Sequence, residues 1–188
     1  MNTRYLDLIE QSFDFPQEEF TLEDDNLLFH GIDLMKLIEE HGTPLKLTYL
    51  PKISQNIQKT KKWFNTARRK IGYSGKYNYC YCTKSSHFHH VLKEALTNDI
   101  HIETSSAYDI NIVESLLTKD KYVICNGFKR GKYIENISRL INNGHKKIIP
   151  ILDNYEELPL LLEATDKKFE IGIRIASEEE PKFEFYTS

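Results

Sequence analysis

A repeated alternation of strand-like and helix-like segments from residue 45 onward is the feature that most constrains the fold of this chain. Short runs rich in β-branched and aromatic residues are each followed by a segment of helical periodicity, and successive runs start about 20 to 30 residues apart, the length of one βα unit. The pattern predicts strands at 45–50, 77–83, 100–104, 122–125, 147–152 and 169–176, with helices at 54–71, 86–96, 106–117, 131–143 and 154–164.

Strands and helices in this order predict an α/β fold with a parallel sheet, which is either open and doubly wound or a (β/α)8 barrel. The glycine fingerprint of a dinucleotide site is absent, because Gly72 and Gly75 precede a strand, whereas a phosphate loop follows one. We therefore predict an incomplete (β/α)8 TIM-type barrel with about six parallel strands. Two strands would be missing, which suggests the front part of a longer protein.

The predicted barrel occupies residues 45–188, and residues 1–44 form a short N-terminal segment that leads into it. Residues 1–21 are acidic and aromatic with weak helical character. Residues 26–30 are suited to a strand, and residues 32–41 form an amphipathic helix with apolar positions at 34, 35, 37 and 38.

Composition indicates a soluble globular protein. The chain has 188 residues, is 40% hydrophobic and carries a net charge of −3, so electrostatics give no reason to expect nucleic acid or a membrane surface as a partner. The basic stretch 59–70 is the exception, and we interpret it as the solvated face of an amphipathic helix that also carries Trp63, Phe64 and Ala67. No apolar run of about 18 residues and no apolar signal core are present, which predicts a cytoplasmic location.

The cysteines fit that location. Cys80, Cys82 and Cys125 are too few for a disulfide framework, and small apolar filler is the expected role of the first two. A helix places His87 and His90 on one face without the cysteines, so no metal site is predicted.

Polar residues stand where the predicted strands end, which is where βα barrels gather their chemistry: Lys84, Glu103, Asn126 and Arg174. Each also has an ordinary interpretation. Lys84 suits a solvated surface position, Glu103 the first turn of a helix, and Asn126 an Asn-Gly turn. A lysine amine reacts with an aldehyde only where desolvation or neighbouring cations leave some of it unprotonated.

Arg174 is the hardest of the four to dismiss, because it lies within an apolar strand pattern. An arginine that faces a barrel interior needs a carboxylate or an anionic ligand beside it. We expect Glu103 to be that partner.

Five segments carry a family resemblance, in order from about residue 26 to the end of the chain. Together they resemble the alanine-racemase-type (fold type III) pyridoxal-phosphate decarboxylases, and most of all biosynthetic arginine decarboxylase. The segments are His41-Gly-Thr-Pro-Leu45, Tyr81-Cys-Thr-Lys84, Ile102-Glu-Thr-Ser-Ser106 with Asp109, Ile124-Cys-Asn-Gly-Phe-Lys129 and Gly172-Ile-Arg-Ile175.

The resemblance implies pyridoxal 5'-phosphate as cofactor and Lys84 as the catalytic, Schiff-base lysine. Glu103, Asn126 and Arg174 would bind the cofactor beside Lys84. The implied reaction of the full-length protein is the decarboxylation of an amino acid, arginine in the first place, to agmatine and CO2 in polyamine biosynthesis, within a homodimer.

The chain departs from the family pattern after the lysine, where Ser85 and Ser86 replace a small residue and an asparagine. The ring-stacking histidine, the phosphate loop and the substrate-binding acids are expected beyond Ser188, so we predict that these 188 residues alone do not catalyse. Two alternatives remain: a decarboxylase-like barrel that has lost catalysis and acts as a binding or regulatory protein, and an α/β protein with no cofactor.

Overall fold

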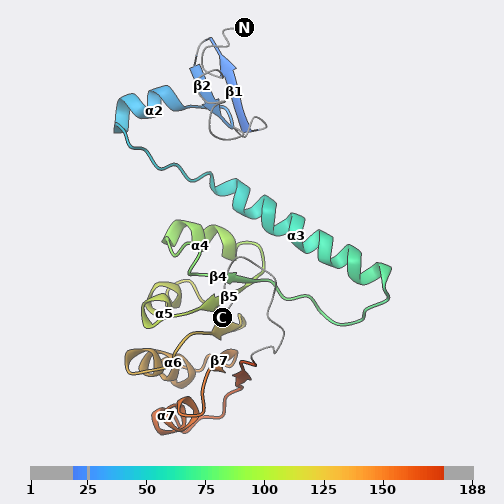
Figure 1. Cartoon of the computed structure of the whole chain (residues 1–188), viewed down its shortest axis with the longest axis vertical. Coiled ribbons are helices and arrows are strands. Elements are labelled where there is room, and N and C mark those ends of the chain that lie inside the picture. Colours follow the sequence, from blue (N-terminus) through green and yellow to red (C-terminus); the bar gives the residue numbers. More distant parts are fainter. Residues whose placement is uncertain (1–18, 25, 176–188) are drawn as a thin grey trace. The chain divides into compact units, whose positions relative to one another are not determined.

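The computed structural model describes residues 19–24 and 26–175, and these residues form two compact units (Figure 1). One unit ends at Thr48 and the other begins at Tyr49. The weak helical character predicted for residues 1–21 falls almost entirely on residues 1–18, which lie outside the described part.

The first unit is a small antiparallel sheet followed by one helix. Its elements are β1 (Phe20–Glu23), β2 (Asn26–Phe29), β3 (Ile32–Asp33) and α2 (Leu34–His41), with the strands in the order β1-β2-β3. The strand predicted at 26–30 is confirmed. The helix predicted at 32–41 begins at Leu34, two residues later than predicted, because Ile32 and Asp33 pair with β2. The Asp33 carboxylate caps this helix by accepting a hydrogen bond from the backbone N–H of Met35 at 2.9 Å.

The second unit is a parallel sheet of five strands in sequence order, β4-β5-β6-β7-β8, with a helix before each strand or after it. Figure 1 shows α4, α5, α6 and α7 side by side along this sheet. The predicted α/β barrel fold, present in part, is therefore confirmed. The elements are α3 (Leu50–Lys70), β4 (Cys80–Cys82), α4 (His89–Leu96), β5 (His101–Thr104), α5 (Ala107–Glu114), β6 (Val123–Cys125), α6 (Lys132–Asn142), β7 (Ile148–Leu152), α7 (Glu157–Ala164) and β8 (Gly172–Ile173).

Within residues 26–175 the parallel sheet has five strands where about six were predicted, and the strand predicted at 45–50 is wrong. Residues 45–49 have no regular structure, and α3 begins at Leu50 with Pro51 in its first turn. Leu45 and Leu47 are exposed, and no described strand pairs with this segment. A strand is stabilised by a neighbouring strand, so alternation alone does not produce one.

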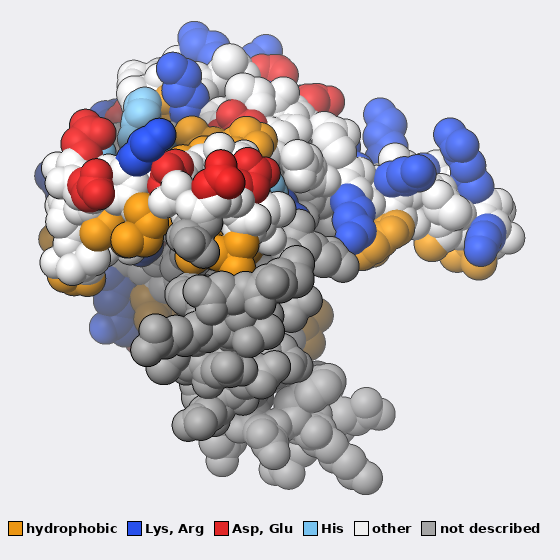
Figure 2. All heavy atoms as spheres, turned by 90° about the horizontal axis from the view of Figure 1, so that it is seen from above, with side chains coloured by type: hydrophobic (Ala, Val, Ile, Leu, Met, Phe, Trp, Pro, Cys, Tyr) orange, Lys and Arg blue, Asp and Glu red, His pale blue; other side chains and the backbone are white. Residues whose placement is uncertain are grey.

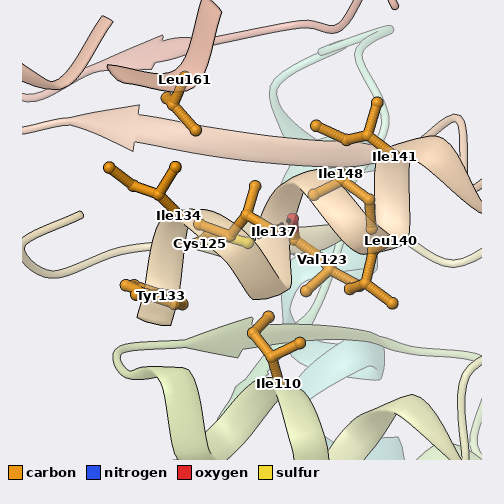
Figure 3. Packing of buried hydrophobic residues seen from close by; sticks show 10 residues of the cluster. All are labelled: Ile110, Val123, Cys125, Tyr133, Ile134, Ile137, Leu140, Ile141, Ile148 and Leu161. Atoms are coloured by element: carbon orange, nitrogen blue, oxygen red, sulfur yellow. Dashed lines mark hydrogen bonds between the residues drawn. The ribbon is translucent and has the colours of Figure 1, made fainter. Parts of the chain in front are cut away.

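One face of the sheet packs on the helices. Ile102, Val123 and Ile148 are in register on β5, β6 and β7, and all three are buried. Val123 and Ile148 join α6 in a continuous core, in which Ile137 and Leu140 are fully buried (Figure 3). These apolar contacts fix the register and thus the level at which every strand ends.

The other face carries Glu103 and is less deeply buried. Cys82, Glu103, Ile124 and Ile149 form the next row of the register, and each is only partly buried. In a closed barrel this face lines the interior, and the segments after the strands form the rim where active sites lie.

Candidate functional site

Lys84 lies at the carboxyl end of β4, as predicted. The Thr83 backbone N–H donates to the Glu103 carbonyl at 3.0 Å, which extends the ladder one residue past β4. The Ser85 hydroxyl donates to the Cys82 carbonyl at 2.7 Å and closes the turn that contains Lys84. Lys84 itself is exposed, so its side chain is open to solvent in the described part of the chain.

Glu103 lies beside this turn, on the neighbouring strand. Its register partner on β4 is Cys82, and the Ser105 hydroxyl donates to Glu103 Oε1 at 3.1 Å. Glu103 Oε2 and Thr83 Oγ1 are buried without a hydrogen-bond partner of normal geometry in the described part of the chain. A buried polar atom left unpaired costs about 1–3 kcal/mol, so Glu103 Oε2, on the same face of the sheet as Cys82, marks a place suited to a polar ligand.

The pKa of the Cys82 thiol depends on the charges at the ends of β4 and β5. Burial raises its pKa, and the Glu103 carboxylate raises it further by hydrogen bonding and by charge. The backbone and the positive charge of Lys84 lower it. Lys84, Cys82 and Glu103 therefore form one electrostatic cluster at the ends of β4 and β5.

Two substitutions should move this thiol pKa in opposite directions. Glu103→Gln is expected to lower the Cys82 pKa, because an anion that disfavours the thiolate is removed, and Lys84→Met is expected to raise it. The measurement is the pH dependence of alkylation by iodoacetamide, followed at each cysteine by peptide mass spectrometry.

Cys80 and Cys125 serve as internal controls. Burial raises the pKa of Cys80 and the charge of Glu103 raises it further, with no contribution from Lys84, so Lys84→Met should leave Cys80 unchanged. Burial raises the pKa of Cys125 to about 12, so this thiol should stay unreactive while the protein is folded. Shifts of Cys82 in the same direction in both variants would contradict the cluster.

Asn126 follows β6 at the same end of the sheet. Its backbone N–H donates to the Thr104 carbonyl at 2.8 Å, which places it next to the end of β5. Gly127 then turns the chain with a positive φ of 75°. Lys84, Glu103 and Asn126 thus lie at the ends of three consecutive strands.

Arg174 lies at the far edge of the sheet, and its expected partner was wrong. Arg174 Nη1 is 3.5 Å from Oδ1 of Asp153, which directly follows β7, whereas Glu103 is on β5. β8 is three strands away from β5 in the described sheet, so Arg174 and Glu103 are separated along the sheet by about 14 Å at about 4.8 Å per strand. The carboxylate of Asp153 is on the neighbouring strand end, so it pairs with the Arg174 guanidinium, and Glu103 is too far away to do so.

Sequence reasoning missed a buried ion pair at this rim. Lys129 Nζ is 3.3 Å from Glu157 Oε2, and the side chains are 0% and 2% exposed. Glu157 also accepts the backbone N–H groups of Lys129 and Asp153, each at 2.9 Å. One carboxylate therefore joins the segment after β6 to the segment after β7. Its only sequence signal was a lysine following the Asn-Gly turn.

No cluster of three or more His, Cys, Asp or Glu suited to a metal ion occurs within residues 19–24 and 26–175. The candidate site accordingly consists of Lys84, Glu103 with its hydrogen-bonded Ser105 hydroxyl, and Asn126, all at the ends of adjacent strands. Arg174, paired with Asp153, lies at the far edge of the sheet.

Known structures share this fold. A diaminopimelate decarboxylase from M. jannaschii, solved with L-lysine, matches with a TM-score of 0.74 at 20% identity, over 88% of this chain and 37% of its own. The biosynthetic arginine decarboxylase SpeA from Campylobacter jejuni matches with a TM-score of 0.67 at 19% identity, over 83% and 29%. The chain has the barrel fold of the fold type III pyridoxal-phosphate decarboxylases, present in part.

Relatives found by sequence similarity carry the name biosynthetic arginine decarboxylase. Biosynthetic arginine decarboxylase from Gloeobacter violaceus is 29% identical over 154 residues, which are 78% of this chain and 23% of the relative. Its counterpart from Bacteroides thetaiotaomicron is 26% identical over 157 residues, or 77% and 25%. The predicted resemblance to biosynthetic arginine decarboxylase is confirmed, and the chain spans about a quarter of the length of these relatives. No family model matches the chain.

Proposed function

We propose that this chain is the cofactor-anchoring part of a pyridoxal-phosphate-dependent decarboxylase that acts on arginine, with Lys84 as the residue that bonds to the cofactor aldehyde. The observation that carries the proposal is the position of Lys84 just after β4, next to the end of β5, where Glu103 Oε2 is buried without a hydrogen-bond partner among the described residues. Sequence similarity to biosynthetic arginine decarboxylases supports arginine as the substrate.

Each rim residue then has a definite task. The Lys84 amine would hold the cofactor and would be available to move a proton at the substrate carbon. Glu103 would hydrogen-bond the bound group, while Asn126 would line the rim. Arg174, which pairs with Asp153, would help to hold the cofactor by supplying positive charge. When bound, pyridoxal phosphate supplies an electron sink for the charge left as CO2 departs.

The setting of the reaction is part of the proposal. We infer that the chain acts in the cytoplasm, which its three free cysteines support, and as a homodimer, as the resemblance implies. Ser85 and Ser86 would supply hydroxyls where related decarboxylases carry an asparagine, so local contacts to the cofactor would be shorter in reach.

Reductive trapping tests the role of Lys84. The chain is mixed with pyridoxal phosphate, treated with borohydride and digested, and the modified lysine is identified by mass spectrometry. We expect the adduct on Lys84 and its loss in Lys84→Ala. The control is Lys146→Ala, which removes an exposed lysine before β7, at the opposite end of the strands.

An adduct spread over surface lysines and unchanged in Lys84→Ala would refute the anchoring role. It would instead favour a decarboxylase-like barrel that acts by binding a partner. Substrate choice is tested by the release of labelled CO2 from arginine, compared with ornithine and diaminopimelate, using any longer polypeptide that contains this chain. Release from another substrate in preference to arginine would overturn the arginine assignment.

A further inference from the structure

Helix α3 holds an unusual share of the positive charge of this protein. Its 21 residues include seven Lys and Arg and no Asp or Glu. The chain has 25 Lys and Arg, so the other 18 accompany all 28 carboxylates. The helix dipole accounts for three of the seven, because only Arg68, Arg69 and Lys70 lie in the last turn. The overall charge of −3 therefore conceals a strongly basic helix.

The first half of α3 is anchored to the barrel unit. Ile53 and Ile57 pack in one apolar cluster with Ala95 and Ile100. Lys61 Nζ donates to the backbone carbonyls of Asn98 and Asp99 at 3.0 and 3.1 Å. These contacts fix the direction of the helix relative to the sheet.

Residues 59–70 are called the α3 arm here, and beyond Lys61 the arm makes none of these contacts. Residues 62–67 are all exposed, and Trp63 retains 61% of its accessible surface. Figure 1 shows α3 extending past α4, and Figure 2 shows Lys and Arg side chains gathered along the projecting arm.

The outward side of the arm combines cations with one aromatic platform. A shallow hollow of about 450 Å³ is lined by Lys59, Lys62, Trp63, Thr66, Ala67 and Lys70. Lys59 Nζ lies 4.9 Å from the centre of the Trp63 ring, over one of its faces. Phe64 belongs to a different side, because its ring stacks on Tyr77 at 4.2 Å and 5°.

This arrangement suits a nucleic acid strand better than a lipid surface. A helix that lies on a membrane inserts several large apolar side chains, whereas Trp63 is the only one in the hollow. No helix in the described part of the chain is long and apolar enough to cross a bilayer. Single strands bind where cations track the phosphates and an aromatic ring stacks on a base.

We propose that the α3 arm binds single-stranded nucleic acid, with a base stacked on Trp63 and phosphates paired with Lys59, Lys62 and Lys70. This departs from the expectation drawn from net charge, because charge complementarity acts over one helix and not over the whole chain. The proposal is independent of decarboxylase chemistry, since the arm lies outside the strand ends that carry Lys84.

The test is the binding of a fluorescein-labelled oligouridine by the whole chain, measured by anisotropy at several salt concentrations. Three phosphate contacts predict a slope of about −2 in log K against log salt. Trp63 is the single tryptophan of the chain, so stacking should quench its intrinsic fluorescence. Trp63→Ala should weaken binding about tenfold.

Matched charge reversals separate a local site from general attraction. The variant Lys59→Glu/Lys62→Glu/Lys70→Glu should bind the oligouridine at least tenfold more weakly. The control is Lys119→Glu/Lys146→Glu/Lys168→Glu, which makes the same charge change at exposed lysines outside α3. The control variant should bind almost normally. Circular dichroism checks that both variants fold. Equal losses in the two variants, no fluorescence quenching, or binding to anionic phospholipid vesicles without binding to the oligouridine would each overturn the proposal.

Discussion

Replacing Lys129 with methionine should lower the free energy of unfolding by about 3–5 kcal/mol, because it leaves a buried carboxylate without its counter-ion. Lys129 is fully buried and Glu157 is 2% exposed, so water cannot take over the pairing. The lost contact includes the hydrogen bond from Lys129 Nζ to the Gly127 carbonyl. Urea unfolding followed by circular dichroism measures the change.

A second substitution should recover part of that loss. In Lys129→Met/Glu157→Gln the buried charge is gone, while the amide oxygen can still accept one of the two backbone N–H groups that Glu157 binds at 2.9 Å. We expect the double variant to be more stable than Lys129→Met alone. If it is equally unstable or worse, the unpaired charge is not the cause of the loss.

An exposed ion pair provides the control for this series. Lys132 Nζ is 2.9 Å from Glu135 Oε2, but the two side chains are 72% and 62% exposed. Lys132→Met should therefore change stability by no more than about 1 kcal/mol. The contrast isolates burial from charge pairing as the source of the large effect.

The repeating architecture was readable from the sequence because it depends on local patterns. The strands predicted at 100–104, 122–125 and 147–152 appear as β5, β6 and β7, since short alternating or apolar runs between helices are typical of strands in a parallel sheet. Residues 45–50 show the limit of that reasoning. Their alternating pattern meets no described neighbouring strand, and pairing is a property of the sheet and not of the segment.

In the candidate site, too, some features could be predicted from the local sequence and others could not. The positions of Lys84 and Asn126 followed from where their strands end, which is local information. The pairing of Arg174 with Asp153, and the burial of Lys129 against Glu157, depend on which loops meet in space. A lysine is so seldom buried that sequence alone favours the surface, and only the partner supplied by α7 reverses this preference.

Gly127→Ala should destabilise the barrel unit by about 3 kcal/mol, for two separate reasons. Gly127 has a φ of 75°, a conformation that costs a residue with a side chain about 1–2 kcal/mol. An added Cβ would also lie 2.5 Å from the carbonyl oxygen of Ser105 and 3.3 Å from its carbonyl carbon. Both are backbone atoms, so no side-chain rotation relieves the contact. Thermal and urea unfolding measure the loss.

Gly144→Ala separates these two causes. Gly144 has a φ of 86°, but its added Cβ would meet only the flexible end of Lys119, at 3.7 Å. This variant should show the backbone cost of about 1–2 kcal/mol without the steric one. Equal losses of stability at the two glycines would mean that the contact with Ser105 costs nothing. The loop after β6 would then move away from the loop after β5 without resistance.

A larger loss at Gly127 would have a consequence for the rim. The Ser105 backbone N–H donates to Asp109 at 3.0 Å and its hydroxyl donates to Glu103 at 3.1 Å, so this loop resists displacement. The strain would then be relieved by moving Asn126 and the Lys129 segment. Gly127→Ala should accordingly alter the alkylation rate of Cys82 very little, while it exposes the segment after β6 to proteolysis. Close packing of adjacent βα loops, and not the strands alone, would then hold the candidate site in place.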